Sequence, residues 1–420
     1  MNLLQDLEYR RLIYQITDRD RLGKRLESGP ITLYVGFDPT ADSLHIGNLL
    51  QILLLRRFQL HGHHPIAVVG GGTGLIGDPS GKQSERQLNP EEVVIGWTSK
   101  IRQQLEQYLD FDSSVNSARI VNNYDWLGQL DLIPFLRDIG KHFPISTMLA
   151  KDSVKSRLEF GISYTEFSYM VLQAYDFLHL YQEFNCELQA GGSDQWGNIT
   201  AGTDLIRRIT GDTAFGMTLP LITQADGSKL GKTEDGTVWI DVERTSAYQF
   251  YQYWINTDDQ DVLPFLKYFT FLTQGELSEL ATTVAEKPWE RVAQRTLARE
   301  VTTLVHGADA ADSAENISQA LFYGKLADLD ADEIEQGLYD VPTHDLHENQ
   351  EVQLVDLLAE AKISPSKRRA REDIQNGAIL VNDARVTDPA AILFPTDRIA
   401  GKYIVIRRGK NKYYLVKWQI

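Results

Sequence analysis

The stretch ITLYVGFDPTADSLHIGNLLQILLLRRFQL, residues 31–60, joins a short apolar run to a long segment with the apolar spacing of a helix. A turn-forming Asp-Pro pair separates the two, as expected where a strand passes into a helix. His45 and Asn48 place an imidazole and an amide at the head of this otherwise apolar helix. One interpretation is a helix capped by Ser43 with a histidine at the surface. The other is an anion site, because the first turn of a helix has free N–H groups.

The first 220 residues repeat this alternation of strand and helix. Further strand-like runs are short, apolar and end in Gly or Asn: 65–70, 118–123 and 186–192. Longer runs with near-helical apolar spacing are 91–109 and 165–184. Strands separated by helices predict an α/β fold, a Rossmann-like doubly wound parallel sheet with helices on both faces. Ligands of such folds bind beyond the carboxyl ends of the strands.

The rest of the chain changes character twice. After residue 246 the pattern is mostly helical, and the last 70 residues combine two helix-like and three strand-like segments, an α+β pattern. We expect the following parts: an α/β domain over 1–222, a polar loop and connection over 223–245, an α-helical domain over 246–308, an acidic linker over 309–350, and a small α+β domain over 351–420.

The charge is unevenly distributed along the chain. The formal net charge is -16, yet residues 351–420 hold 13 Lys+Arg against 8 Asp+Glu. Residues 309–348 hold 11 carboxylates against Lys325 alone. This asymmetry indicates a basic module attached to an acidic body that repels nucleic acid, although a chance fluctuation in surface charge is the alternative.

Composition excludes several classes of protein. With Cys186 as the only cysteine, a disulfide framework or cysteine-rich zinc site within one chain is excluded. No apolar run approaches the roughly 20 residues of a membrane helix. The first turns carry Asp6 and Glu8, which argues against a targeting peptide. We therefore expect a cytoplasmic protein.

The glycine-rich segment VVGGGTGLIGDPSGK, residues 68–82, contains a formal G-x-G-x-x-G after a strand. A dinucleotide fingerprint needs a helix that opens within the glycines, whereas this run continues into turn-forming residues. The spacing does not fit a Walker A loop either. We interpret the segment as a ligand-facing loop that carries Asp78, with Lys82 and Arg86 as nearby cations; a loop needing only close backbone approach is the alternative.

Three polar residues interrupt the apolar segment at 165–184. Tyr169, Gln173 and Asp176 share one helical face by their spacing. They form either a partly wet edge or one wall of a pocket for a small polar molecule with an ammonium and a hydroxyl. The strand at 31–37 supplies a complement, because Tyr34 shares its face with Gly36 and Asp38.

Two further polar stretches follow in the chain. CELQAGGSDQWGN, residues 186–198, reads as a strand, a glycine pair and then Asp194, a carboxylate placed to hold ribose hydroxyls. DGSKLGKTEDGT, residues 226–237, is a polar loop with two lysines that could fold over a polyphosphate. A routine strand-to-helix turn and an exposed hairpin loop are the plainer alternatives.

Together these motifs resemble a known family. HIGN at 45–48 and KLGKT at 229–233 resemble the two signatures of class I aminoacyl-tRNA synthetases. With YVGFDPTADSLHIGN, GDPSGK, YMVLQAYD and GGSDQWGN, nearly the whole chain resembles the bacterial-type tyrosyl-tRNA synthetases. Residues 364–386 resemble the alpha-L RNA-binding domain. Asn48 stands where the class usually has His, and Leu230 and Gly231 stand where Met and Ser are usual.

The resemblance implies an activity. The tyrosine carboxylate attacks the α-phosphate of ATP, which enters with Mg²⁺, and the tyrosyl group of the adenylate then passes to tRNA(Tyr). Catalysis rests on positioning and on stabilising the phosphate charge. A homodimer with an interface around 124–165 is implied, with no protein-bound metal.

The resemblance also implies site residues. Those implied for catalysis are Thr40, His45, Asn48, Lys82, Arg86, Lys229, Lys232 and Thr233. Those implied for tyrosine are Tyr34, Asp78, Tyr169, Gln173, Asp176 and Gln195, of which Tyr34 and Asp176 take the phenolic hydroxyl. Those implied for ATP are Gly36, Asp38, His45, Gly47, Gly192, Asp194 and Lys232. Those for RNA are Lys367, Arg368, Arg369 and Arg371.

Two alternatives remain from the sequence. A tryptophanyl enzyme of the same subclass would have no use for a hydroxyl-binding pair, so Tyr34 and Asp176 argue against it. A non-catalytic RNA-binding relative would bind tRNA without forming an adenylate, and the presence of both signatures argues against that.

Overall fold

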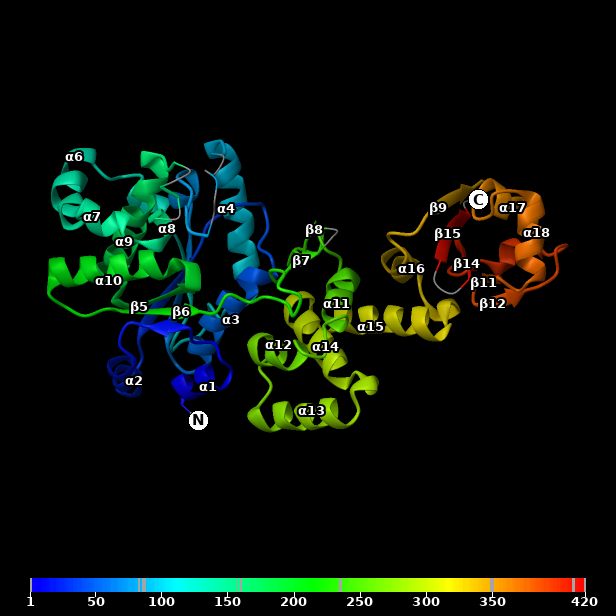
Figure 1. Ribbon diagram of the computed structural model, residues 1–420, viewed down its shortest axis with the longest axis horizontal. Helices are drawn as coiled ribbons and strands as arrows, with labels where there is room; N and C mark the ends of the chain where they lie inside the picture. Colours follow the sequence, from blue (N-terminus) through cyan, green and yellow to red (C-terminus); the bar gives the residue numbers. More distant parts are fainter. Residues whose placement is uncertain are drawn as a thin grey trace. The chain divides into compact units, whose positions relative to one another are not determined.

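The structure of the chain is a computed structural model. It describes residues 2–81, 84, 88–155, 157–158, 161–233, 236–347, 351–409 and 412–418, with the backbone alone at 152, 153, 232 and 233. The chain forms two compact units (Figure 1). The first contains residues 1–244 and 258–293, and the second contains 245–257 and 294–420. Among the described residues, no helix is long and apolar enough to cross a membrane.

A six-stranded sheet forms the centre of the first unit. Its strand order is β1-β6-β5-β2-β3-β4. The strands are β1 (Gln15–Ile16), β2 (Thr32–Phe37), β3 (His64–Val69), β4 (Arg119–Asn122), β5 (Cys186–Gly192) and β6 (Phe215–Leu219). Five are parallel, and the edge strand β1 is antiparallel to β6. The predicted α/β fold is confirmed, but the sheet is mixed rather than wholly parallel, because the two-residue strand β1 closes its edge.

Helices cover both faces of this sheet (Figure 1). The helices of the first unit are α1 (Leu3–Tyr9), α2 (Arg19–Glu27), α3 (Ile46–Leu60), α4 (Glu91–Leu105), α5 (Tyr124–Leu127), α6 (Leu132–Pro134), α7 (Ile145–Leu149), α8 (Asp152–Lys155), α9 (Tyr164–Phe184), α10 (Trp196–Thr210), α12 (Val262–Phe269) and α13 (Gln274–Glu286), of which α3, α4, α9 and α10 pack directly on the strands. The strands and helices predicted at 31–60, 65–70, 91–109, 118–123, 165–184 and 186–192 are all present within a few residues. The glycine-rich segment after β3 forms only a 3₁₀ turn at Thr73–Leu75, so it opens no α-helix.

The second unit begins with packed helices. They are α11 (Ala247–Ile255), α14 (Val292–His306), α15 (Ala308–Tyr323) and α16 (Ala331–Gly337). The prediction of a linker over 309–350 is wrong, because α15 packs against α11 and buries Ala311, Ala314 and Ile317. The acidic residues lie on the other faces of the helix, where Asp312 and Glu315 pair with Arg299.

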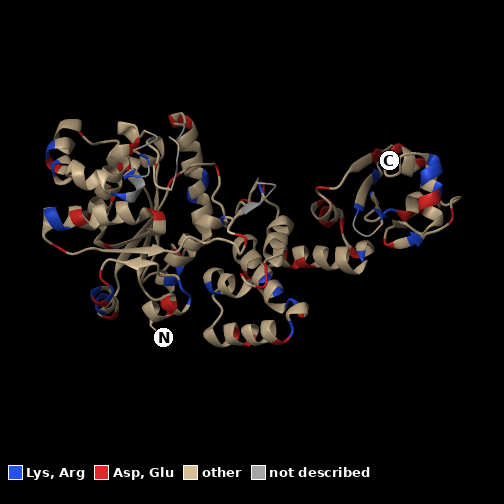
Figure 2. Cartoon of the chain, viewed as in Figure 1, with Lys and Arg blue, Asp and Glu red and all other residues tan. Residues whose placement is uncertain are grey.

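The end of the chain is a small α+β domain. Its five-stranded sheet has the order β12-β11-β14-β15-β9. The strands are β9 (Thr343–Leu346), β11 (Ile379–Val381), β12 (Ala384–Val386), β14 (Tyr403–Arg408) and β15 (Lys412–Trp418), and β10 (Val352–Gln353) pairs separately with β13 (Ile392–Leu393). Helices α17 (Leu354–Glu360) and α18 (Lys367–Gln375) pack against each other. Lys and Arg are concentrated along α18 (Figure 2).

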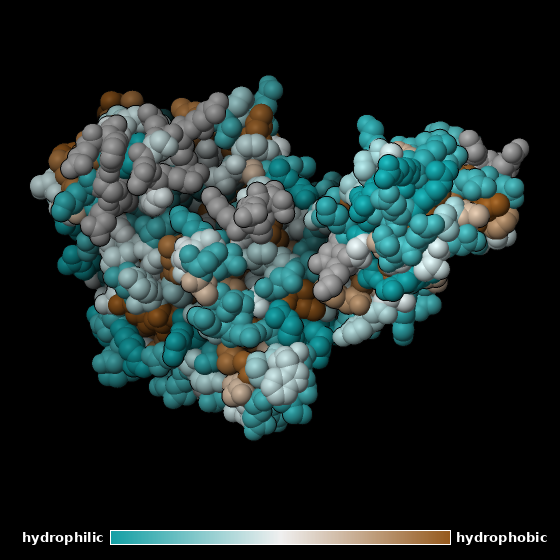
Figure 3. All heavy atoms as spheres, turned by 45° about the vertical axis from the view of Figure 1, so that its right-hand side comes forward, coloured by the Kyte–Doolittle hydropathy of each residue, from teal (hydrophilic) through white to brown (hydrophobic). Residues whose placement is uncertain are grey.

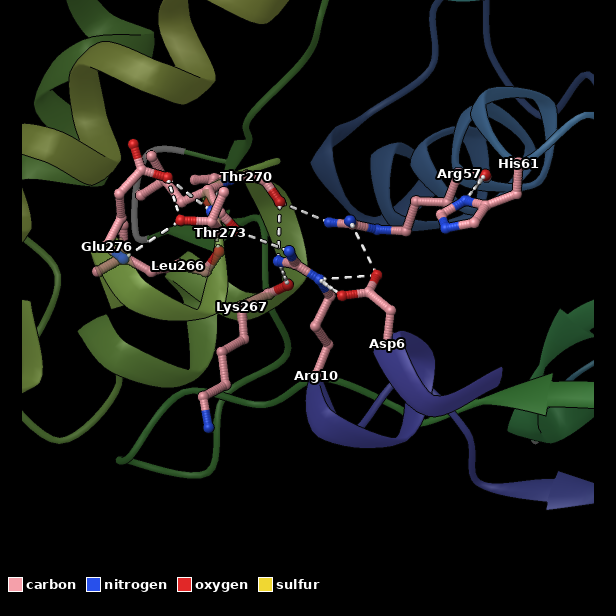
Figure 4. A network of polar contacts seen from close by, with 10 residues as sticks. Asp6, Arg10, Arg57, His61, Leu266, Lys267, Thr270, Thr273 and Glu276 are labelled. Carbon is pink, nitrogen blue, oxygen red and sulfur yellow. Dashed lines mark hydrogen bonds and ion pairs between the residues drawn. The ribbon is translucent and has the colours of Figure 1, made fainter. Parts of the chain in front are cut away.

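A buried polar network joins three helices of the first unit (Figure 4). The guanidinium of Arg10, the C-cap residue of α1, donates to both Asp6 carboxylate oxygens at 2.8 and 3.0 Å. It also donates to the carbonyls of Lys267, Thr270 and Leu272 at the end of α12. Arg57 on α3 donates to the same Thr270 carbonyl at 2.5 Å and lies 3.7 Å from Asp6. Cations at the carboxyl end of a helix favour its dipole, so the network fixes α12 to α1 and α3.

Candidate active site

A pocket of about 480 Å³ opens at the carboxyl end of the parallel strands. It lies where β2 and β5 are neighbours, because the chain proceeds from β2 toward β4 on one side and from β5 toward β6 on the other. Such switch points are where open α/β sheets bind ligands. The predicted site residues that line it are Tyr34, Gly36, Asp38, Thr40, His45, Gly47, Asn48, Asp78, Tyr169, Gln173, Asp176, Gly192, Asp194, Gln195 and Lys229.

The inner wall of the pocket carries two buried polar groups. Among the residues that the structure describes, none is a hydrogen-bond partner of the Tyr34 hydroxyl, and Tyr34 is 2% exposed. The Gln189 Oε1 on the adjacent strand β5 likewise has no partner within the described part of the chain. Burial and the nearby Asp176 carboxylate raise the pKa of Tyr34 well above its usual value, so the phenol is neutral. Unmatched buried polar groups are costly, and both line the pocket, where a bound molecule can supply the missing partner.

Asp176 is held by two residues that the motifs did not single out. Asn123 Nδ2 donates to one carboxylate oxygen at 2.9 Å, and Trp126 Nε1 donates to the other at 2.7 Å. Burial raises the pKa of Asp176 to about 8, although these two hydrogen bonds act in the opposite direction. The Trp126 ring stacks on His179 at 4.4 Å between centroids. The carboxylate is therefore fixed in orientation at the end of the pocket.

A second carboxylate, Asp38, connects β2 with α9. Tyr169 donates its hydroxyl proton to Asp38 Oδ2 at 2.7 Å, and Thr73 donates to Oδ1 at 2.7 Å. Burial, with Asp38 close by, raises the pKa of Tyr169 well above its usual value. Since the proton points at Asp38, the Tyr169 oxygen remains available as an acceptor. Gly70 must lack a side chain here, because a Cβ would lie 2.0 Å from Asp38 Oδ1.

Amides and a third carboxylate form the wall between α9 and α10. Gln195 Nε2 donates to Asp78 Oδ2 at 2.6 Å. Asn198, on the first turns of α10, donates to Gln173 Oε1 at 2.9 Å and to Gln195 Oε1 at 3.2 Å. Asp78 also accepts from the Ser80 backbone N–H at 2.9 Å. This wall therefore presents mostly acceptors, which suits a cationic group.

The glycines at the end of β5, Gly191 and Gly192, form the opposite rim. A Cβ on Gly192 would lie 2.6 Å from Asp194 Oδ1, so the chain needs glycine where this carboxylate turns back over the strand. Burial and the nearby Asp78 raise the pKa of Asp194. Backbone without side chains beside a carboxylate is an arrangement that accepts a sugar and its hydroxyls.

The first turn of α3 forms the outer part of the pocket. His45 is the N-cap of the helix, and its Nδ1 accepts from the Gly47 N–H at 3.0 Å. Asn48 Oδ1 accepts from the His45 N–H at 3.1 Å. The prediction that Ser43 caps the helix is wrong. Its hydroxyl is buried and donates to the Leu44 carbonyl, and the helix begins only at Ile46 with His45 as its N-cap.

The KLGKT loop runs beside this helix. Lys229 lines the pocket with its side chain exposed, and Leu230 is buried. Gly231 has a φ of +80°, and a Cβ there would lie 2.6 Å from Ile46 Cγ1. Four predicted phosphate-binding side chains lie outside the described residues: Lys82, Arg86, Lys232 and Thr233.

The four predicted RNA-binding cations lie together on α18. Lys367, Arg368, Arg369 and Arg371 are all exposed. Lys367 pairs with Asp356 at 3.0 Å, and Arg368 and Arg369 share Glu372 at 3.2 and 3.1 Å. Exposed ion pairs of this kind are worth little, so they can exchange a carboxylate for a phosphate. The surface of this domain seen in Figure 3 is largely hydrophilic.

Comparisons with known proteins agree with this geometry. Residues 26–323 match the family model of class I tRNA synthetases for tryptophan and tyrosine, and residues 333–416 match that of the tyrosine–tRNA ligase C-terminal domain. The chain is 60% identical to the tyrosine–tRNA ligase of Bacillus caldotenax over 419 residues, covering 100% of both chains. It is 58% identical to tyrosine–tRNA ligase 1 of Bacillus subtilis over 420 residues, again covering 100% of both.

The solved structures give the same result. A C-terminally truncated mitochondrial tyrosyl-tRNA synthetase of Aspergillus nidulans superposes with a TM-score of 0.70 at 31% identity, covering 76% of this chain and 94% of that one. The full-length relatives are tyrosine enzymes, which decides against the tryptophanyl and the non-catalytic alternatives. The chain therefore belongs to the tyrosine–tRNA ligases of the class I aminoacyl-tRNA synthetases, enzymes that activate tyrosine with ATP and transfer it to tRNA.

Proposed function

We propose that the inner end of the pocket recognises the phenolic hydroxyl of tyrosine through Tyr34 and Asp176. The Asp176 carboxylate accepts a hydrogen bond from the substrate hydroxyl, and the Tyr34 hydroxyl donates a hydrogen bond to the substrate oxygen. The buried Tyr34 hydroxyl, which accepts or donates no hydrogen bond within the described residues, is the observation that carries this proposal. Phenylalanine would leave both groups buried and unmatched, and sites built around a hydroxyl reject analogues that lack it.

The acceptor-rich wall takes the tyrosine ammonium. Asp78 supplies the negative charge, and the oxygens of Tyr169 and Gln173 complete the set of acceptors. The hydroxyl proton of Tyr169 is already directed at Asp38, which leaves its oxygen lone pairs toward the pocket. Gln195 lies beside Asp78 and orients the substrate carboxylate.

The outer part of the pocket takes ATP, which enters with Mg²⁺ as part of the substrate. Gly36, Asp38, Gly192 and Asp194 line the adenosine site, and the carboxylate of Asp194 holds the ribose. The helix N-terminus at His45, Gly47 and Asn48 receives the phosphates, together with Thr40, Lys82, Arg86, Lys229, Lys232 and Thr233.

The first step then needs no proton transfer. A tyrosine carboxylate oxygen forms a bond to the α-phosphorus while the bond from that phosphorus to the bridging oxygen breaks. Pyrophosphate leaves with the electron pair of that bond. The protein contributes by holding the reacting atoms in line and by stabilising the charge that develops on the phosphate oxygens.

The basic helix α18 binds tRNA phosphates through Lys367, Arg368, Arg369 and Arg371. The helical region over 246–308 serves the anticodon side, and 351–420 is the RNA-binding domain that follows the catalytic domain at 1–222. Affinity that comes from phosphate contacts is strongly salt-dependent. The reducing cytoplasm is the proposed location, since Cys186 is free and buried.

The functional state is a homodimer whose interface lies around 124–165. Large apolar side chains are exposed across this region: Leu132 (68%), Ile133 (71%), Leu136 (45%), Ile145 (59%) and Tyr164 (74%). Contiguous exposed apolar surface marks sites of association, and a second copy of the chain would cover it.

Tyrosine-dependent ATP–pyrophosphate exchange tests the phenol site. Asp176→Ala should lower kcat/KM for tyrosine by roughly 5- to 150-fold, the effect of an unmatched buried polar group, while KM for ATP stays within about twofold of the native value. The control is Asp212→Ala, since Asp212 accepts from the Tyr181 phenol at 2.9 Å on the surface. Equal damage to tyrosine and ATP use by Asp176→Ala would contradict the assignment.

A further inference from the structure

The segment after the KLGKT loop pairs with the residues that lead into α3. The Ile46 N–H donates to the Val238 carbonyl at 3.2 Å, and the Ile240 N–H donates to the Leu44 carbonyl at 3.0 Å. His45 and Trp239 face each other in this short antiparallel bridge. The two signature regions are thus connected through backbone, and one aromatic side chain lies directly opposite the signature histidine.

The Trp239 ring lies between His45 and an ion-paired arginine. The His45 and Trp239 rings meet edge to face, with centroids 6.3 Å apart and planes at 60°. Arg244 lies over Trp239, with its Cζ 3.9 Å from the ring centroid. Arg244 Nη1 is 2.8 Å from Asp42 Oδ1, and Lys100 Nζ is 3.1 Å from Asp42 Oδ2. The indole is therefore held in place by a cation–π contact whose cation is itself paired.

The backbone of α3 constrains the His45 imidazole as well. Because Nδ1 of His45 accepts from the Gly47 N–H, the proton of the neutral ring is on Nε2. A Cβ on Gly47 would lie 2.7 Å from His45 Cε1, so the helix backbone approaches the ring closely. The ring is confined between this backbone and Trp239, and His45 lines the pocket.

We propose that Trp239, held by Arg244, is a positioning residue for His45 in adenylate formation. The proposal rests on the proposed role of His45 at the ATP phosphates. A donor contributes to rate only if it is aligned with the charge that develops in the transition state. Loss of the indole lets the imidazole rotate away from that alignment, so kcat is affected while tyrosine binding at the inner end of the pocket is not.

Tyrosine-dependent ATP–pyrophosphate exchange by the full chain, measured in the pre-steady state and the steady state, tests the positioning role of Trp239. Trp239→Leu should lower kcat about tenfold and leave KM for tyrosine within about twofold, since misplacement of a catalytic group acts on rate. Trp239→Phe keeps an aromatic edge and should recover most of that loss. Arg244→Met, which frees the indole but keeps it, should give a smaller loss in the same direction. Trp289→Leu removes a 74% exposed tryptophan and should change neither constant.

A double variant of His45 and Trp239 separates the positioning role of Trp239 from the proposed role of His45 at the ATP phosphates. His45→Ala should lower kcat by about 10²-fold, as loss of one aligned donor does. If Trp239 acts through His45, then His45→Ala/Trp239→Leu should be no slower than His45→Ala. Three results would overturn the positioning role alone. They are losses of kcat that multiply in the double variant, a native kcat in Trp239→Leu, or a rise in KM for tyrosine as large as the fall in kcat. Full activity of His45→Ala would overturn the phosphate role of His45 and the positioning role with it.

Discussion

Asp6 is the carboxylate that the buried arginines Arg10 and Arg57 share in the network that fixes α12, and its removal gives a measurable prediction. The Asp6 side chain is 12% exposed, and those of Arg10 and Arg57 are 5% and 3% exposed. In Asp6→Ala the two guanidinium groups would remain buried near each other without their shared counter-charge. Removing one partner of a buried ion pair costs about 3–5 kcal/mol.

The lower end of that range is the better expectation for this site. Arg10 would keep its bonds to the three carbonyls at the end of α12, and Arg57 would keep its bond to the Thr270 carbonyl. These partial charges compensate for part of the lost carboxylate. We therefore expect Asp6→Ala to lower the free energy of unfolding by about 3 kcal/mol.

Urea unfolding followed by circular dichroism at one fixed protein concentration measures this loss. Asp20→Ala is the control, because Asp20 is 87% exposed beside Arg19 and surface changes of this kind stay within about 0.5 kcal/mol. Asp6→Ala/Arg57→Met removes one unpaired cation together with the carboxylate, so its loss should be smaller than the sum of the two single losses. A loss in Asp6→Ala no larger than in the control would refute the role given to the network.

Four further outcomes follow from the site and the surfaces. Tyr34→Phe should reduce discrimination between tyrosine and phenylalanine in exchange about tenfold without lowering the melting temperature, because no described residue is a hydrogen-bond partner of the lost hydroxyl; a lower melting temperature would contradict this. Because the pKa of Asp176 is about 8, a growing share of the carboxyl is neutral as the pH falls below 8. The kcat/KM for tyrosine should therefore decline toward acid with an inflection near pH 8, and Asp176→Asn should lack that inflection. Ile133→Asp should shift the chain from dimer to monomer in sedimentation, and an unchanged mass would move the interface elsewhere. Deleting 351–420 should cost aminoacylation far more than exchange, whereas equal losses would make that domain structural.

The main frame of the fold could be predicted from residues because its elements have distinct periods. The run at 65–70 is buried throughout, the run at 31–37 is apolar and buried except at Thr32 and Gly36, and the helix pattern between them keeps one spacing for several turns. β1 could not be predicted, because Gln15 and Ile16 are too few to show alternation and pair only through the edge of β6. Pairing of this kind depends on tertiary context rather than on local pattern.

The acidic helix α15 and the supports of Asp176 show two other limits. In α15 the buried face is built from Ala311, Ala314 and Ile317, and small residues between carboxylates give a weak apolar signal. Asn123 and Trp126 follow β4 and are not close in sequence to the carboxylate that they hold. The sequence shows only that an apolar strand ends in polar residues. This predicts that they lie at the carboxyl edge of the sheet, but it does not predict that they bind Asp176.

Gly231 limits what mutation can reach in the KLGKT loop. Any side chain there would strain a left-handed backbone and enter the space of Ile46 Cγ1. The chain can therefore accept a side chain at this position only if the loop moves away from the head of α3. A substitution at 231 therefore requires the loop to change from one conformation to another, and no series of small adjustments connects the two. A library randomised at 231 alone should return glycine, and other residues should emerge only where 46 varies with it.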